Sequence, residues 1–187
     1  MTMHTLALMI VLLTAAPLFY YCSVRFSGGM KKKLHALNRL SEFLPGKAGC
    51  RWLTPGFRGA CELMPFAVEL LRDSSNTGVC LQISIKAATL FQLEMHKDAD
   101  IVTAEGPHGL MDFDIIEDPD LLAALYLNDA PRRQYIWNFL SAGFSSFTIE
   151  KDRVRIIMHN CDLDEDLQAA ALYIQILALT ALAKDAA

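Results

Sequence analysis

The sequence predicts an α+β protein: an N-terminal single transmembrane helix followed by one domain with a mostly antiparallel sheet, a helix pair and a long apolar C-terminal helix. Three observations support this fold class. Residues 1–24 contain no Lys, Arg, Asp or Glu. Several segments with alternating apolar and polar residues then follow one another directly, whereas a parallel sheet would place a helix between its strands. Most of the remaining helical patterns lie in the second half of the chain.

The composition fits one domain behind a membrane anchor. The chain has 187 residues, of which 53% are hydrophobic, and a net charge of −4. A nucleic-acid-binding domain normally presents a basic face, so we expect no nucleic-acid partner. The five cysteines are odd in number and widely spaced, which favours free thiols in a reducing compartment. No nucleotide-binding or metal-binding motif is complete, so no cofactor is expected.

Residues 1–24 are predicted to cross the membrane. From Thr5 to Val24 the segment gives a helix of about 30 Å, which matches the hydrocarbon core of a bilayer. A cleaved signal peptide is the competing interpretation, but it would begin with a basic region that this sequence lacks. The positive charges follow the segment, so the N-terminus is expected outside and the C-terminal domain in the cytoplasm. A periplasmic domain would require the opposite orientation.

Residues 25–46 are predicted to form a basic juxtamembrane amphipathic helix and linker, ended by Pro45 and Gly46. Its apolar stripe consists of Met30, Leu34, Leu37, Leu40 and Leu44. The basic residues expected to contact the membrane surface are Arg25, Lys31, Lys32, Lys33 and Arg39. Basic side chains near anionic headgroups are attracted to them. Two alternatives remain open: the stripe packs on the domain, or it forms a short coiled coil.

Residues 47–187 are predicted to form the cytoplasmic α+β domain, beginning with strands. Pro55-Gly56 is a turn signal, so a hairpin is expected between Arg51–Thr54 and Phe57–Leu63. A second pair of strands, Ala67–Leu71 and Val79–Lys86, flanks the turn-rich residues 74–78. Two further strands are expected around Phe91–Met95 and over residues 112–116.

The helices and a last hairpin follow. Asp118-Pro119 predicts a helix start, and a second helix is expected from the Asn128–Pro131 region to Leu140. Strands are then predicted over Phe144–Ile149 and Arg153–Met158. The final helix, from about Leu163 to Lys184, is apolar nearly all round. A core helix is favoured, while an interface helix and a second span remain open.

The acidic residues suggest two sites, neither of them complete. The stretch from Asp98 to Asp120 contains eight acidic residues and no Lys or Arg. It could bind a cation or a basic partner, although such runs are usually solvated surface. Asp162, Asp164 and Asp166 have the spacing that opens a calcium loop. The required glycine and glutamate are absent downstream, so these acids are expected to cap the last helix.

Histidines and cysteines give no recognisable centre either. His159 and Cys161 could supply metal ligands, but no second ligand pair follows, so no metal site is expected. Cys61 or Cys80 as a nucleophile would need a neighbouring base. A tethered enzyme would have to assemble its site from dispersed residues, drawn from His96, His108, His159, Cys161 and the acidic run.

A second basic feature lies in the C-terminal half, at Arg132-Arg133 and at Lys151, Arg153 and Arg155. It could grip a phosphate or balance the acidic run across the fold. The second interpretation is favoured, because paired surface charges are common.

The anchor and the absence of a catalytic motif together predict the kind of function. We expect a membrane-anchored, non-enzymatic interaction or assembly module, acting as an accessory subunit of a membrane-associated system. The alternative is the tethered enzyme. The expected partners are the lipid bilayer and either another protein or a second copy of the chain.

Overall fold

The computed structural model describes residues 3–25, 28–72, 78–96, 112–117 and 122–179, some of them by their backbone alone. The helices are α1 (Met3–Arg25), α2 (Gly28–Asn38), the short 3-10 helix η1 (Arg39–Glu42), α3 (Leu122–Asn128), α4 (Ala130–Ser141) and α5 (Glu165–Leu179). The strands are β1 (Gly46–Arg51), β2 (Thr54–Cys61), β3 (Met64–Arg72), β4 (Val79–Lys86), β5 (Gln92–His96), β6 (Asp112–Glu117), β7 (Ser146–Glu150) and β8 (Arg153–Met158). The predicted α+β class is confirmed.

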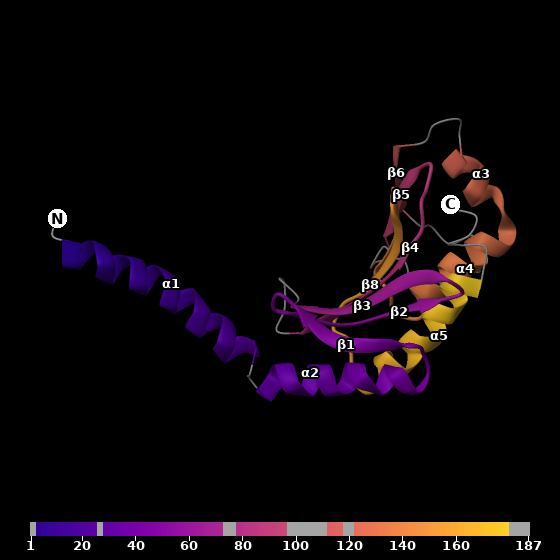
Figure 1. Ribbon diagram of the computed structural model, residues 1–187. Helices are drawn as coiled ribbons and strands as arrows, with labels where there is room; N and C mark the ends of the chain where they lie inside the picture. Colours follow the sequence, from indigo (N-terminus) through magenta and orange to yellow (C-terminus); the bar gives the residue numbers. More distant parts are fainter. Residues whose placement is uncertain (1–2, 26–27, 73–77, 97–111, 118–121, 180–187) are drawn as a thin grey trace.

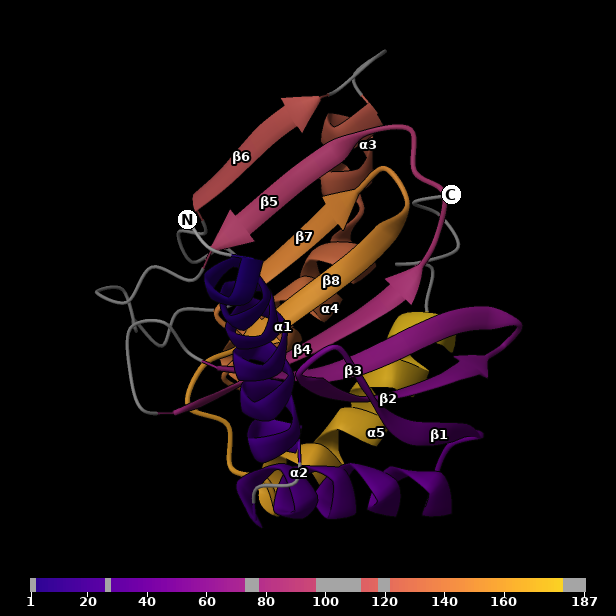
Figure 2. The ribbon, with the colours of Figure 1, turned by 60° about the vertical axis from the view of Figure 1, so that its left-hand side comes forward.

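The strands form one eight-stranded sheet in the order β1-β2-β3-β4-β8-β7-β5-β6, and every neighbouring pair is antiparallel (Figures 1 and 2). The first four strands are neighbours in sequence as well as in space. The C-terminal hairpin then inserts between β4 and β5, so that β8 pairs with β4 and β7 pairs with β5. The two parts of the sheet, β1–β4 and β5–β6, are therefore joined by a hairpin that is distant from both β4 and β5 in the sequence.

The first predicted hairpin turns at a different place. Arg51 pairs with Thr54, so the turn consists of Trp52 and Leu53, while Pro55 and Gly56 lie inside β2. The prediction of a Pro-Gly turn was wrong because Trp52 adopts a left-handed φ of 57°, a conformation that favours Gly or Asn.

A later glycine in the same strand has a packing reason. A Cβ at Gly59 would overlap the carbonyl oxygen of Pro45 and the ring of Phe66. Gly59 therefore permits the close approach of the chain that enters β1.

The other strand predictions are confirmed within one to three residues. β3 and β4 pair as expected, although residues 74–77 of the predicted turn lie outside the described residues. β7 and β8 form the expected last hairpin. The strands predicted around residues 91–95 and 112–116 are β5 and β6, which pair with each other.

The helix pair is also present, as α3 and α4. The side chain of Asp129 accepts a hydrogen bond from the backbone N–H of Arg132 at 3.2 Å, and Pro131 lies in the first turn of α4. This N-cap is the start signal that the sequence predicts. The start signal Asp118-Pro119, by contrast, lies outside the described residues.

Helices cover one face of the sheet, with α3, α4 and α5 behind it in Figure 2 and α2 along its lower edge. The core lies between the layers and includes Phe57, Val68, Ile83 and Ile156 from the strands. Edge-on contacts, with ring centroids 5.0–6.2 Å apart, link Phe139, Phe144 and Tyr173 to one another.

The apolar stripe of α2 and η1 belongs to this core. Leu37, Leu40 and Leu44 are buried there. The structure therefore agrees with the alternative in which the stripe packs on the domain. The apolar helix α5 also packs into the core, through Leu167, Ala170, Ile174 and Leu177. Its predicted end at Lys184 lies outside the described residues.

Helix α1 projects away from the domain, on the side of the sheet opposite α3 and α4 (Figures 1 and 2). Most of the side chains described along it are exposed, among them those of Met9, Leu13, Leu18 and Phe19. Within the part of the chain that the structure describes, no helix combines the length and the apolarity needed to cross a membrane. The transmembrane anchor over residues 1–24 remains a prediction.

Candidate functional site

The candidate site is the sheet face that the helical layer does not cover. Side chains alternate between the two faces of a strand, and the register shows which ones share a face. One row crosses seven strands of this face and consists of Lys47, Arg58, Ala67, Ser84, Arg155, Thr148 and Glu94. Six of these seven side chains are polar or charged. We call this surface the polar face.

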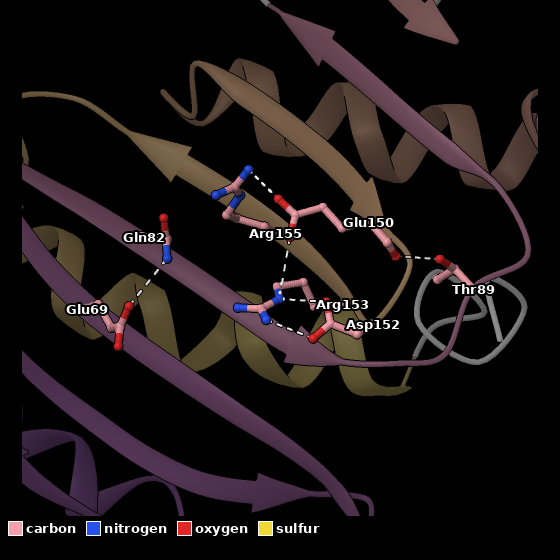
Figure 3. Close-up of polar contacts among 7 residues, drawn as sticks. All are labelled: Glu69, Gln82, Thr89, Glu150, Asp152, Arg153 and Arg155. Atoms are coloured by element: carbon pink, nitrogen blue, oxygen red, sulfur yellow. Dashed lines mark hydrogen bonds and ion pairs between the residues drawn. The ribbon is translucent and has the colours of Figure 1, made fainter. Parts of the chain in front are cut away.

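An ion pair between β2 and β3 fixes one part of the polar face. Arg58 Nη2 donates to Glu69 Oε1 at 2.5 Å. Gln82 Nε2 on β4 donates to the other oxygen, Glu69 Oε2, at 3.4 Å (Figure 3 shows the second contact). The carboxylate of Glu69 therefore connects three adjacent strands.

A second network lies at the β7–β8 turn (Figure 3). Glu150 is paired with Arg155, whose Nη2 lies 2.5 Å from Oε1, and with Arg153, whose Nε lies 3.4 Å from Oε2. Arg153 also binds Asp152 with two hydrogen bonds, of 2.9 and 2.7 Å. Hydrogen bonding by Arg153 lowers the pKa of Asp152, and that of Arg153 is raised in return. Thr89 donates to the backbone carbonyl of Glu150, which ties the β4–β5 connection to the same turn.

Between these two networks the polar face is hollowed, with a volume of about 300 Å³. We call it the cationic hollow, and it is lined by Pro65 and Phe66 of β3 together with Arg58, Ala67, Ser84, Lys86, Asp152 and Arg153. Ala67 and Ser84 are directly opposite each other in the register of β3 and β4. Their side chains are short, whereas the basic side chains around them are long, which accounts for the depression.

The row continues beyond the hollow to two buried polar atoms. Thr148 and Arg155 face each other across β7 and β8. Within the described residues, Thr148 Oγ1 and Arg155 Nε are buried and have no hydrogen-bond partner. A buried polar group without a partner lowers stability, so this part of the polar face retains unused hydrogen-bonding capacity.

The residues predicted to contact the membrane surface are described only in part. Lys31 and Lys32 are exposed on α2, while Lys33 is half-buried. Arg39 Nη1 lies 3.2 Å from Asp164 Oδ1, so its charge is engaged with the start of α5. Arg25 is the last residue of α1, and its side chain is not described. Membrane contact by these residues stays a prediction.

The structure brings two of the predicted chemical residues together: Cys161 and Cys80 are both buried and interact electrostatically. Burial raises the pKa of the Cys161 thiol to about 12, with Asp166 as a further cause, so this thiol is a poor nucleophile. Burial, followed by the charge of Glu62, also raises the pKa of Cys61. His159 is exposed after β8.

The remaining members of the hypothetical enzyme site are described only in part. His96 ends β5, two strands away from β8. His108 lies outside the described residues, and so do five acids of the acidic run, Asp98, Asp100, Glu105, Asp118 and Asp120. Among the described residues, no group of three His, Cys, Asp or Glu side chains is arranged to hold a metal ion.

The acids before α5 act as helix caps, as the sequence predicts. Asp162 Oδ1 accepts hydrogen bonds from the backbone N–H groups of Asp164 and Glu165, at 2.7 and 3.1 Å. Asp166 Oδ2 accepts in turn from the N–H of Asp162 at 2.6 Å. The hydrogen bonds from the N–H groups of Asp164 and Glu165 lower the pKa of Asp162. The reciprocal bonds satisfy N–H groups that the helix itself leaves free.

The sequence did not identify Arg58, Ser84 or Lys86 as members of a site. The only signal for them in the sequence is that each is a polar residue in a segment predicted to be a strand. Arg153 and Arg155 were identified, but their described partners are neighbouring acids of the β7–β8 hairpin. Comparisons with protein-family models, with curated proteins and with solved structures find no match to this chain.

Proposed function

We propose that the protein is a membrane-anchored, non-enzymatic interaction or assembly module whose domain faces the cytoplasm. One observation carries the proposal: α1 exposes apolar side chains and projects from a domain that has its own core (Figure 1). Leu13, for example, is 72% exposed. An apolar helix that does not pack on its own domain needs lipid or protein around it. The basic residues after it favour a cytoplasmic domain.

The β1–β2 turn supports a position of the domain next to the membrane surface. It reaches toward the side of the domain on which α1 lies (Figures 1 and 2). Trp52 in this turn is 81% exposed and follows the exposed Arg51. Tryptophan favours the interfacial region of a bilayer, where an amphipathic ring is stable. The turn is therefore expected to touch the headgroup region when α1 is inserted.

The opposite end of the hairpin supports a protein contact. Leu63, in the β2–β3 turn, is 97% exposed, and Leu90 is exposed in the β4–β5 connection at the same end of the sheet. Glu62 and Leu63 both have positive φ, of 51° and 67°. This conformation normally selects Asn or Gly. Backbone strain of this kind is concentrated at functional sites, so we take the outward-facing Leu63 as the candidate contact residue.

Topology is the first thing to measure, because the described helices include none that meets the requirements for a span. A C-terminal reporter active only in the cytoplasm should be active, and the chain should resist extraction from membranes by alkali. An inactive reporter would refute the orientation. Complete extraction would refute the anchor.

The interaction surface can be tested by position-specific photocrosslinking. A crosslinker at Leu63 should give one discrete adduct in intact cells, either with a second copy or with another protein. A crosslinker at Leu172, which is exposed on the helical layer, is the matched control and should give none. Equal labelling from both positions would contradict a contact at the Leu63 end.

A further inference from the structure

We propose that the cationic hollow binds a phosphate group. The proposal goes beyond the proposed function and does not depend on the anchor, because every residue that defines the hollow belongs to the sheet or to its β7–β8 turn.

The charge of the hollow is the first argument. Three cationic side chains, Arg58, Lys86 and Arg153, line it, against one carboxylate, that of Asp152. When the ion-pair partners Glu69, Glu150 and Arg155 are included, four cations stand against three carboxylates. The surroundings of the hollow therefore keep one net positive charge in a chain whose net charge is −4. Cationic groups around a concave surface concentrate their field there and attract anions.

The arrangement of the cations is the second argument. Arg58 comes from β2, whereas Lys86 and Arg153 are opposite each other on β4 and β8. Ala67 and Ser84 lie between them and form the floor. An anion resting there meets positive groups on two sides and a hydroxyl below.

The ion pairs hold the two arginines without using all their donors. Arg58 gives Nη2 to Glu69, and Arg153 gives Nε and Nη2 to Asp152. A guanidinium has five N–H donors, so each arginine keeps others for a ligand. Lys86 is exposed and has no ion pair among the described residues. It is the cation whose charge is least compensated.

These donors suit a phosphate group better than a carboxylate. A phosphate presents acceptor oxygens in several directions, whereas the two oxygens of a carboxylate lie in one plane. Cations on opposite walls and a hydroxyl on the floor can therefore all contact one phosphate. The group could belong to a soluble phosphorylated compound or to a phospholipid headgroup, since both offer the same oxygens.

The test uses the full chain, isotope-labelled, in a detergent that contains no phosphorus. Inorganic phosphate is titrated at constant ionic strength while the backbone amide signals of Ser84 and Lys86 are followed by NMR. We expect saturable shifts, and about tenfold weaker binding for Lys86→Gln, as for the loss of one charge-assisted hydrogen bond. Ser84→Ala should weaken binding by a smaller factor.

Lys151→Gln is the matched control. It removes the same charge next to Asp152, but Lys151 does not line the hollow. We expect an unchanged affinity. Equal weakening by Lys86→Gln and Lys151→Gln would show a general charge effect and would overturn the proposal.

A second arm distinguishes the source of the phosphate. The same amides are followed in nanodiscs of phosphatidylcholine with and without phosphatidic acid, whose phosphate is not shielded by choline. Shifts with phosphatidic acid that Lys86→Gln suppresses identify a lipid headgroup. Shifts with inorganic phosphate alone identify a soluble ligand. An absence of Lys86-dependent shifts in both arms overturns the proposal.

Discussion

The two apolar helices at the ends of the chain have opposite environments. α5 buries Leu167, Ile174 and Leu177 against the sheet, whereas α1 exposes Leu13 and Leu18. Their sequences alone do not separate them, because each is apolar nearly all round. The difference teaches that apolarity indicates only that a helix must be covered, and that the packing of the domain decides what covers it. α5 is covered by its own chain, and α1 requires another environment.

The largest expected effect comes from removing a buried side chain of α5. Leu177 has an exposed fraction of 0%. Leu177→Ala should lower the free energy of unfolding by about 2–5 kcal/mol, because it removes apolar contacts and leaves a cavity. Urea denaturation of the full chain in detergent measures this change. Leu13→Ala in α1 is the control and should change the value by less than about 0.5 kcal/mol. Equal effects would abolish the comparison.

A charge introduced into α1 tests the other half of the comparison, the environment that surrounds α1. Leu13→Arg should oppose membrane insertion by about 3 kcal/mol, the cost of an arginine near the centre of a span. The fraction of protein that resists alkaline extraction should fall, while urea denaturation of the domain stays unchanged. Leu172→Arg, at an exposed position of α5, should leave extraction as in the wild type. If Leu13→Arg remains fully membrane-bound, α1 is covered by protein and not by lipid.

The start of α5 should show a pH dependence that α1 lacks, because α1 has no acidic residue in its first turn. Two backbone N–H donors lower the pKa of Asp162. A lowered folded-state pKa stabilises the fold above the unfolded value of about 3.9, and this stability is lost as the pH falls through the folded-state pKa. Asp162→Asn should therefore flatten the acid side of the stability curve, by less than the Leu177→Ala effect. An unchanged curve would mean that the cap contributes no charge-dependent stability.

The smallest expected effect concerns the contact between α5 and the basic segment. The ion pair of Arg39 with Asp164 is largely exposed, so its coupling energy should be about 1 kcal/mol or less. A double-mutant cycle of Arg39→Ala and Asp164→Ala measures it, and high salt should reduce it. A larger coupling that salt leaves unchanged would show that this junction is more buried in solution.

The sequence was sufficient for elements that carry their own local signal. The alternation in β4 and the Asp129 cap of α4 each specify a structure within a few residues. The turn at Trp52 could not be predicted, because its left-handed backbone contradicts the preference of that residue type. The cationic hollow could not be predicted either. Arg58 and Arg153 are 95 positions apart in the sequence, and they approach only because β8 pairs with β4.

That pairing also sets the order in which the protein can acquire its structure during synthesis. β1–β4 can pair as soon as they leave the ribosome, and β5 can pair with β6. The two parts stay unconnected until the β7–β8 hairpin is made. In the meantime β4 and β5 each have an unpaired edge, which is a site for pairing with other chains. A nascent chain that stalls before residue 146 would therefore be prone to aggregate.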